Sequence, residues 1–192
     1  MRHAAFWLMG IALCSMLLQG CAAAVVAGTA TGATVATDRR TTGKMWDDQT
    51  LELKGEKLIA QDKILDNKVR VNVTSMNGIV LLTGEAETTA LRKRALTHVR
   101  RVQGVRRIHN HIRIAPRRSF SDSSHDKWIT SKIKTKQATT KGVGPTHVKV
   151  VTANSVVYLM GLVKRAEADV ATKLARETKG VTRVVKLFEY TD

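Results

Sequence analysis

A segment of 14 residues occurs twice in this chain, and the repeat limits the possible folds more than any other feature. Residues 71–84 are similar to residues 148–161, and residues 102–108 are similar to residues 178–184. The two spacings differ by one residue, so one copy has a small insertion or deletion ahead of its second helix. A repeat of this kind is one supersecondary unit, and we predict two tandem copies of a domain of about 70 residues.

Each copy contains a predicted hairpin. Apolar and polar residues alternate over residues 69–74, which is the pattern of a strand with one buried face. Asn77-Gly78 predicts a tight turn, because both residues tolerate positive φ. The apolar residues 79–83 predict a central strand, and we expect it to end at Gly84, where the chain leaves the sheet.

A second helix and a last strand follow the hairpin. Apolar residues at helical spacing occupy residues 90–102 in copy one and 168–175 in copy two. Gly104 and Gly180 lie where a C-terminal capping glycine is expected. Residues 108–114 then alternate as a strand, so each copy has the order helix, strand, strand, helix, strand.

Three local features give further expectations. Asp48 and Asp126 are suited to N-capping, so each opening helix is expected to begin near one of them. Gly55 predicts a shorter or kinked first helix, because glycine costs a helix about 1 kcal/mol relative to alanine. Asn154-Ser155 replaces the Asn-Gly turn in copy two, which predicts a weaker or differently shaped turn.

These patterns predict an α+β fold of two tandem αββαβ domains. Each domain is expected to be a three-stranded mixed sheet with two helices on one face. The expected boundaries are a signal peptide at residues 1–20, a lipidated tether at 21–45, copy one at 46–115, a linker at 116–124 and copy two at 125–191.

The first residues resemble an export signal with a lipid attachment site. The apolar residues 4–18 would form a helix of about 22 Å, too short to cross a hydrocarbon core of about 30 Å. The ending Leu-Gln-Gly-Cys21 resembles a bacterial lipobox, in which the cysteine is acylated and becomes the new N-terminus. Ala22 follows it, whereas an aspartate there would resemble an inner-membrane signal. The resemblance implies an outer-membrane lipoprotein anchored by Cys21, with residues 22–45 as a flexible tether.

The repeated pattern of strand, Asn-Gly, apolar strand, glycine, helix and x-x-Gly-Val resembles the BON domain. The resemblance covers almost all of residues 46–190. BON domains are non-enzymatic modules associated with phospholipid membranes. Two tandem units behind a lipobox are similar to a group of outer-membrane lipoproteins that are connected with envelope integrity and cell division.

A net charge of +16 predicts an anionic partner. For a protein exported to the periplasm, that partner is expected to be phosphate-bearing lipid, since each nearby Lys or Arg adds about 1 kcal/mol of attraction. Nucleic acid would suit the charge but conflicts with export. A secondary basic patch is expected at Arg92, Arg94, Arg100, Arg101, Arg106 and Arg107.

The opening helix of copy two offers a sharper candidate for phospholipid contact. Ile129 and Ile133 are expected to face the core, which turns Trp128 toward the side of the helix. An indole among lysines suits a bilayer interface, although Trp128 packed into the core or against copy one is the alternative. The expected contact residues are Lys127, Trp128, Ser131, Lys132, Lys134 and Thr135.

Catalytic and metal chemistry find little support in the sequence. His109 and His111 could chelate a metal, but nearby arginines would repel a cation, so we expect a solvated sheet face there. The acidic residues around the first helix (Asp47, Asp48, Glu52 and Glu56) are expected to have structural roles. No nucleophile motif or phosphate loop is visible, and we expect no enzyme activity and no cofactor.

Two functional hypotheses follow. In the first, copy two binds anionic phospholipid, such as phosphatidylglycerol or cardiolipin, and the protein supports envelope integrity from the periplasmic face of the outer membrane. In the second, the chain is an adaptor that uses its sheet edges and basic face to dock on an envelope or division protein. Binding of an acyl-free fragment to anionic vesicles distinguishes the two.

Overall fold

The computed structural model describes residues 38–116 and 120–192, and ten helices and strands are placed within these ranges. Copy one contains α3 (Thr42–Ala60), β1 (Val69–Met76), β2 (Ile79–Ala86), α4 (Thr89–Arg100) and β3 (Arg107–Ile114). Copy two contains α5 (Phe120–Thr139), β4 (Val148–Ala153), β5 (Val156–Val163), α6 (Arg165–Arg176) and β6 (Arg183–Tyr190). The predicted order of elements is confirmed in both copies.

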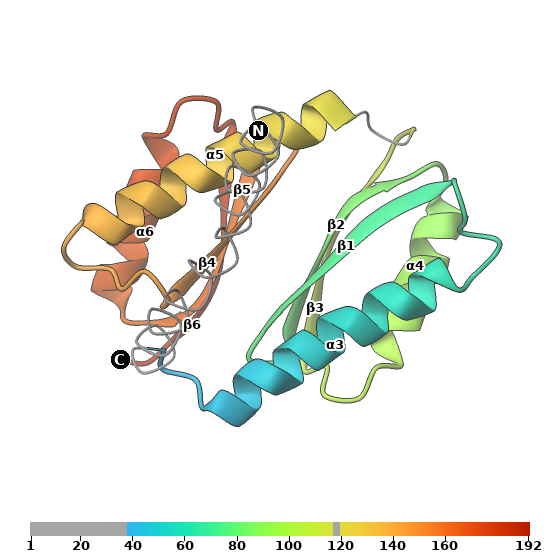
Figure 1. Ribbon diagram of the computed structural model, residues 1–192, viewed down its shortest axis with the longest axis horizontal. Helices are drawn as coiled ribbons and strands as arrows, with labels where there is room; N and C mark the ends of the chain where they lie inside the picture. Colours follow the sequence, from blue (N-terminus) through green and yellow to red (C-terminus); the bar gives the residue numbers. More distant parts are fainter. Residues whose placement is uncertain (1–37, 117–119) are drawn as a thin grey trace, which may run out of the picture. The chain divides into compact units, whose positions relative to one another are not determined.

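Each copy has a three-stranded mixed sheet with its hairpin strands antiparallel. The strand orders are β1-β2-β3 and β4-β5-β6, and the third strand is parallel to the central one. Figure 1 shows α3 and α4 on one face of the first sheet and α5 and α6 on one face of the second. A parallel pair needs a crossover, which α4 and α6 supply. The α+β fold class is therefore as predicted.

The opening helices begin earlier than Asp48 and Asp126, so the predicted N-caps were wrong. Thr41 caps α3, and its hydroxyl accepts a hydrogen bond from the Lys44 amide. α3 thus begins inside the expected tether, and α5 begins at Phe120, inside the expected linker. Both aspartates lie within their helices, where they are buried and serve another purpose.

Two glycines allow the backbone to come close to a neighbour. α3 continues through Gly55 without ending, and a Cβ there would lie 3.2 Å from Cγ1 of Val73. Gly55 therefore lets the helix approach β1, and the expected shortening was wrong. Gly84 does not end its strand either, since β2 continues to Ala86. It has φ of 120°, and a Cβ there would collide with the Arg70 carbonyl.

Three apolar clusters form the core of residues 38–116 and 120–192. One lies between the first sheet and its helices, and one between the second sheet and its helices. The third joins the opposite faces of the two sheets, with Met76, Ile79, Leu81, Ala153, Tyr158 and Met160 buried in it. Alternation explains this, because Val80 and Leu82 point to the helices while Ile79 and Leu81 point to the other copy.

No helix within residues 38–116 and 120–192 combines the length and the hydropathy that a membrane span requires.

Candidate functional site

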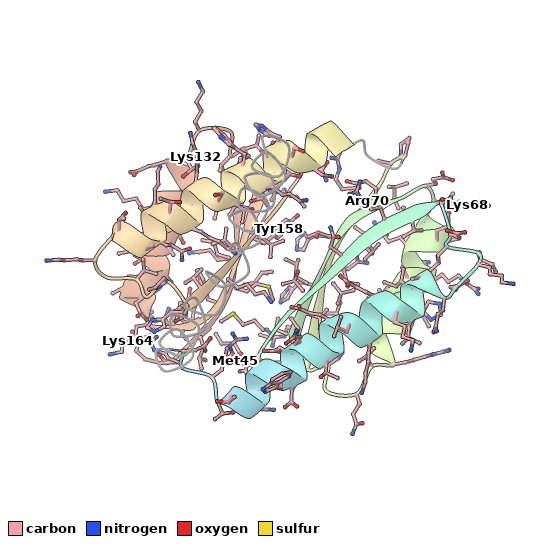
Figure 2. All side chains as sticks on the ribbon, in the orientation of Figure 1. Met45, Lys68, Arg70, Lys132, Tyr158 and Lys164 are labelled. Atoms are coloured by element: carbon pink, nitrogen blue, oxygen red, sulfur yellow. The ribbon has the colours of Figure 1, made fainter. Side chains whose placement is uncertain are left out.

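The outer face of α5 carries an exposed tryptophan with a lysine above its ring. Trp128 is 44% exposed, and Nζ of Lys132 lies 3.9 Å from the ring centroid. The His125 ring stacks on the same indole, with 5.9 Å between centroids. Figure 2 shows where Lys132 lies on α5. An ammonium group over an indole is attracted by the ring's quadrupole, so this face presents apolar surface and positive charge at one point.

A hollow of about 510 Å³ lies beside this pair. Its second wall is the segment after α6, and Lys136 connects the two walls by donating hydrogen bonds to the Glu177 carbonyl and the Thr178 hydroxyl. We call the surface around this hollow the α5 outer face. It is formed by Trp128, Ser131, Lys132, Thr135, Lys136, Glu177, Thr178 and Lys179.

The predicted lipid-contact residues do not all share this face. Lys127 and Lys134 line a different and larger hollow of about 900 Å³, whereas Ser131 and Thr135 line both. We call the larger hollow the α5–β4 groove. It is lined by Ser123, Asp126, Lys127, Thr130, Ser131, Lys134, Thr135 and Ala138 of α5, Val151, Thr152 and Ala153 of β4, and Arg70, Asn72, Thr83, Gly84 and Glu85 of copy one.

The buried aspartates hold the hairpin turns. Asp48 accepts hydrogen bonds from the amides of Asn77 and Gly78 at 2.7 and 2.9 Å, and from the Ser75 hydroxyl at 2.7 Å. Burial alone would raise the pKa of Asp48, but the bonds from Gly78, Ser75, Asn77 and Arg40 outweigh burial, so the pKa lies below its ordinary value.

Asp126 repeats this arrangement in copy two. It accepts from the amides of Asn154 and Ser155, each at 2.9 Å. Both turn residues have positive φ, at 55° and 58°, much like Asn77 at 54° and Gly78 at 74°. The turn therefore has the shape of an Asn-Gly turn, and the expected difference in shape was wrong. Its serine adopts a conformation that favours glycine, in a turn that Asp126 secures.

Two residues of the expected basic patch are paired with carboxylates of the chain, although their side chains remain exposed. Arg94 and His98 both contact the buried carboxylate of Asp62. Arg106 donates to the Asn77 carbonyl and pairs with Glu189 of copy two. These two arginines are thus engaged in structural contacts. The other four residues of the patch are Arg92, which is partly exposed, and Arg100, Arg101 and Arg107, which are exposed.

His109 and His111 do not lie on a solvated face, which corrects the sequence-based expectation. Both are half-buried, and the His111 ring lies 4.8 Å from the Tyr158 ring of copy two. Desolvation and the neighbouring charges of His109 and Arg183 lower the pKa of His111, and desolvation and Arg107 lower that of His109. The part of the chain that the structure describes contains no group of three potential metal ligands.

Each hairpin turn also contacts the last strand of the other copy. Asn77 donates to Glu189 at 2.7 Å, and Arg113 donates to Asn154. Arg113 and Glu189 are the seventh residues of β3 and β6, so the two contacts are equivalent. This contact was not predicted from the sequence, although polar residues occupy these equivalent positions of the repeat, Asn77 with Asn154 and Arg113 with Glu189.

Residues before α3 contact copy two. Arg39 donates to Glu167 and to the Leu162 carbonyl, and His147 also lies 3.0 Å from Glu167. Burial alone would raise the pKa of Glu167, but hydrogen bonds from Arg39, the Lys164 amide and His147 lower it to about 2. The proposed lipid attachment site, Cys21, and the signal peptide lie outside the described residues.

Comparison with known proteins gives matches along most of the chain. Residues 47–116 and 125–192 each match the BON domain family. "Outer membrane lipoprotein DolP" of Haemophilus influenzae is 39% identical over 178 residues, which cover 93% of this chain and 92% of that protein. The "21 kDa hemolysin" of Actinobacillus pleuropneumoniae is 37% identical over 153 residues, covering 80% of this chain and 79% of that protein.

A more distant relative is "Osmotically-inducible protein Y" of Escherichia coli, which is 31% identical over 146 residues, covering 74% of this chain and 72% of that protein. None of these three names describes an enzyme. Two family matches and a similarity that extends over nearly the whole length lead to one conclusion: this chain belongs to the BON domain family.

Proposed function

We propose that this outer-membrane lipoprotein of the BON domain family binds anionic phospholipid through the α5 outer face and so supports envelope integrity. The observation that carries the proposal is the exposed Trp128 ring with Lys132 3.9 Å from its centroid. Indole rings favour the interfacial region of a bilayer, and ammonium groups favour its phosphates. Contact of this face with a bilayer would therefore place both the Trp128 ring and the Lys132 ammonium group in favourable surroundings.

Charge favours α5 over the equivalent helix of copy one. α5 carries four lysines and two aspartates, whereas α3 carries three lysines and four carboxylates. α3 also exposes apolar side chains, Trp46 at 66% and Leu53 at 60%. An anionic membrane surface therefore attracts α5 and repels α3, since each basic residue near the surface adds about 1 kcal/mol of attraction.

Vesicle co-sedimentation of residues 38–192 tests this site without the contribution of an acyl anchor. We expect the fragment to sediment with vesicles that contain phosphatidylglycerol or cardiolipin, and less as salt concentration rises. Trp128→Ala combined with Lys132→Glu should reduce binding by at least about tenfold, because it removes an interfacial ring and reverses a charge.

Lys54→Glu is the matched control, because Lys54 lies six residues after Asp48 just as Lys132 lies six residues after Asp126. It makes the same charge change on α3 and should leave most of the binding in place. Equal losses in the two variants would mean that only net charge matters and would exclude a defined site on α5. In cells, the α5 variant should also fail to restore detergent resistance to a strain that lacks the protein.

A further inference from the structure

β1 is an edge strand, and acidic side chains of α3 accept hydrogen bonds from its outward-pointing amides. Glu52 accepts a hydrogen bond from the Ser75 amide at 2.6 Å, and Glu56 accepts one from the Val73 amide at 3.5 Å. Lys149 of copy two lies across the same edge, where it donates to Glu52 at 2.6 Å and to the Ser75 carbonyl at 3.1 Å. An uncovered edge strand can pair with a strand of another chain, and these side chains prevent such pairing at β1.

The edge of β4 lacks this cover. The equivalents of Glu52 and Glu56, counted from the aspartate of each opening helix, are Thr130 and Lys134. Within the described residues, the Thr130 hydroxyl hydrogen-bonds to the Thr152 hydroxyl alone, at 2.7 Å, and a lysine cannot accept a hydrogen bond. The equivalent of Lys149 is the shorter Asn72, counted from the hairpin turns.

Two backbone amides of β4 consequently point toward the uncovered edge of the second sheet, where Thr152 lines the α5–β4 groove. Thr152 and Val150 have the same place in their hairpin as Ser75 and Val73, since each pair lies one and three residues before the turn-closing pair. Ladder bonds alternate along an antiparallel strand, so these amides point away from β5. Within the ranges that the structure describes, no carboxylate accepts a hydrogen bond from either of them.

The groove in front of these amides is large and carries exposed lysines. Lys127 and Lys134 project from α5 along it, and its volume is about 900 Å³. Its two carboxylates are already engaged, because Asp126 holds the hairpin turn and Glu85 accepts from the Asn154 side chain at 2.9 Å. The groove therefore presents amide donors and ammonium groups to a ligand.

We infer that the α5–β4 groove binds an extended acidic peptide segment of a partner protein, which adds to the second sheet alongside β4. Carbonyl groups of the peptide accept from the amides of Thr152 and Val150, and its carboxylates pair with Lys127 and Lys134. Copy one provides the internal precedent, since the acceptors at the equivalent amides are glutamates. Two outward amides two residues apart match the spacing of carbonyls on one side of a strand, which a single small anion does not.

This inference is independent of the proposed lipid contact, because the α5–β4 groove and the α5 outer face share only Ser131 and Thr135. A fluorescent eight-residue peptide of alternating valine and glutamate serves as the probe for residues 38–192. We expect saturable binding, and we expect the amides of Thr152 and Val150 to become protected from hydrogen exchange. A peptide of alternating valine and lysine should not bind.

Thr130→Glu combined with Lys134→Glu rebuilds in copy two the arrangement of copy one. We expect this variant to bind the acidic peptide at least about tenfold more weakly, since its own carboxylates occupy the amides and repel the ligand. Its amides at Thr152 and Val150 should be protected without peptide. Thr139→Glu combined with Lys141→Glu makes the same charge change outside both hollows and should retain binding.

Three results would overturn the inference. The first is no saturable binding of the acidic peptide, and the second is equal weakening by the rebuilt and control variants. The third is loss of anionic vesicle binding in the rebuilt variant alone with peptide binding intact, which would assign the groove to lipid.

Discussion

Copy one and copy two have the same fold, but they use the side chains that face their edge strands differently. In copy one, Asp48, Glu52 and Glu56 form a row along α3 that contacts the hairpin and the edge of β1. In copy two only the first acidic position is kept, as Asp126. The aspartate is therefore part of the fold, whereas the glutamates are specific to the closed edge of copy one.

This difference is the basis on which both proposed binding surfaces are assigned to copy two. The acidic side chains of α3 form hydrogen bonds and ion pairs with other residues of the chain. Lysines and threonines at the equivalent positions leave α5 with an open groove on one side and the Trp128–Lys132 pair on another. The two copies therefore differ in one respect: acidic side chains cover the edge of β1, and none covers the edge of β4 within the described residues.

The largest loss of stability is expected when Asp48 or Asp126, which hold equivalent positions in the two copies, is replaced by alanine. Asp48→Ala should lower the free energy of unfolding by about 3 kcal/mol, since it leaves buried donors without an acceptor. Asp126→Ala should cost about 2 kcal/mol, because it leaves the amides of Asn154 and Ser155 without their acceptor. Urea denaturation of residues 38–192 measures both, and a loss under about 0.5 kcal/mol, the range of ordinary surface changes, would contradict this role for either residue.

A smaller loss of stability should distinguish the covered edge of β1 from the edge of β4. Glu52→Ala removes the acceptor for the Ser75 amide and the partner of Lys149, and should cost about 1.5 kcal/mol. Thr130→Val at the equivalent position removes one hydroxyl contact and should cost about 0.5 kcal/mol. The same denaturation series tests this pair, and equal costs would mean that the edges are equally closed.

The contact between the copies should weaken in acid. The pKa of His111 is lowered in the folded chain, so the unfolded chain binds a proton more readily, and stability falls as pH drops below the ordinary value of about 6.5. The melting temperature should therefore decrease between pH 7.5 and pH 5.5. His111→Phe should show a flatter pH profile, and an unchanged profile would show that His111 is not responsible.

The smallest effect is expected on the exposed end of α4. Arg100 and Arg101 are exposed, and their replacement by alanine should change the free energy of unfolding by less than about 0.5 kcal/mol. Vesicle co-sedimentation should also change far less than for the Trp128 and Lys132 variant. A comparable loss of vesicle binding would place a lipid contact on copy one.

Local sequence patterns were sufficient to predict the repeated αββαβ fold. Alternating valines and an Asn-Gly turn define a hairpin by themselves, and helical spacing defines α4 and α6. The roles of Asp48 and Asp126 were not predictable in this way, because an aspartate near a helix start is equally suited to capping that helix. Their turn partners Asn77 and Asn154 lie 29 and 28 residues further along the chain.

The packing between the copies was also beyond local patterns. His109 and His111 alternate with isoleucines as surface residues would, yet that face of β3 meets copy two. Polarity indicates which face of a strand avoids its own core, but it does not show whether a second domain covers that face. Trp128 was identified correctly as an exposed residue because Ile129 and Ile133 fix the buried side of α5.

The fluorescence of two single-tryptophan variants tests the division between the copies most directly. Residues 38–192 contain only Trp46 on α3 and Trp128 on α5, and both are exposed, so each copy supplies one probe. With phosphatidylglycerol vesicles, Trp46→Phe should show a blue shift from the remaining Trp128, whereas Trp128→Phe should show almost none. A blue shift from Trp46 alone, or equal shifts from both, would contradict the assignment of membrane contact to copy two.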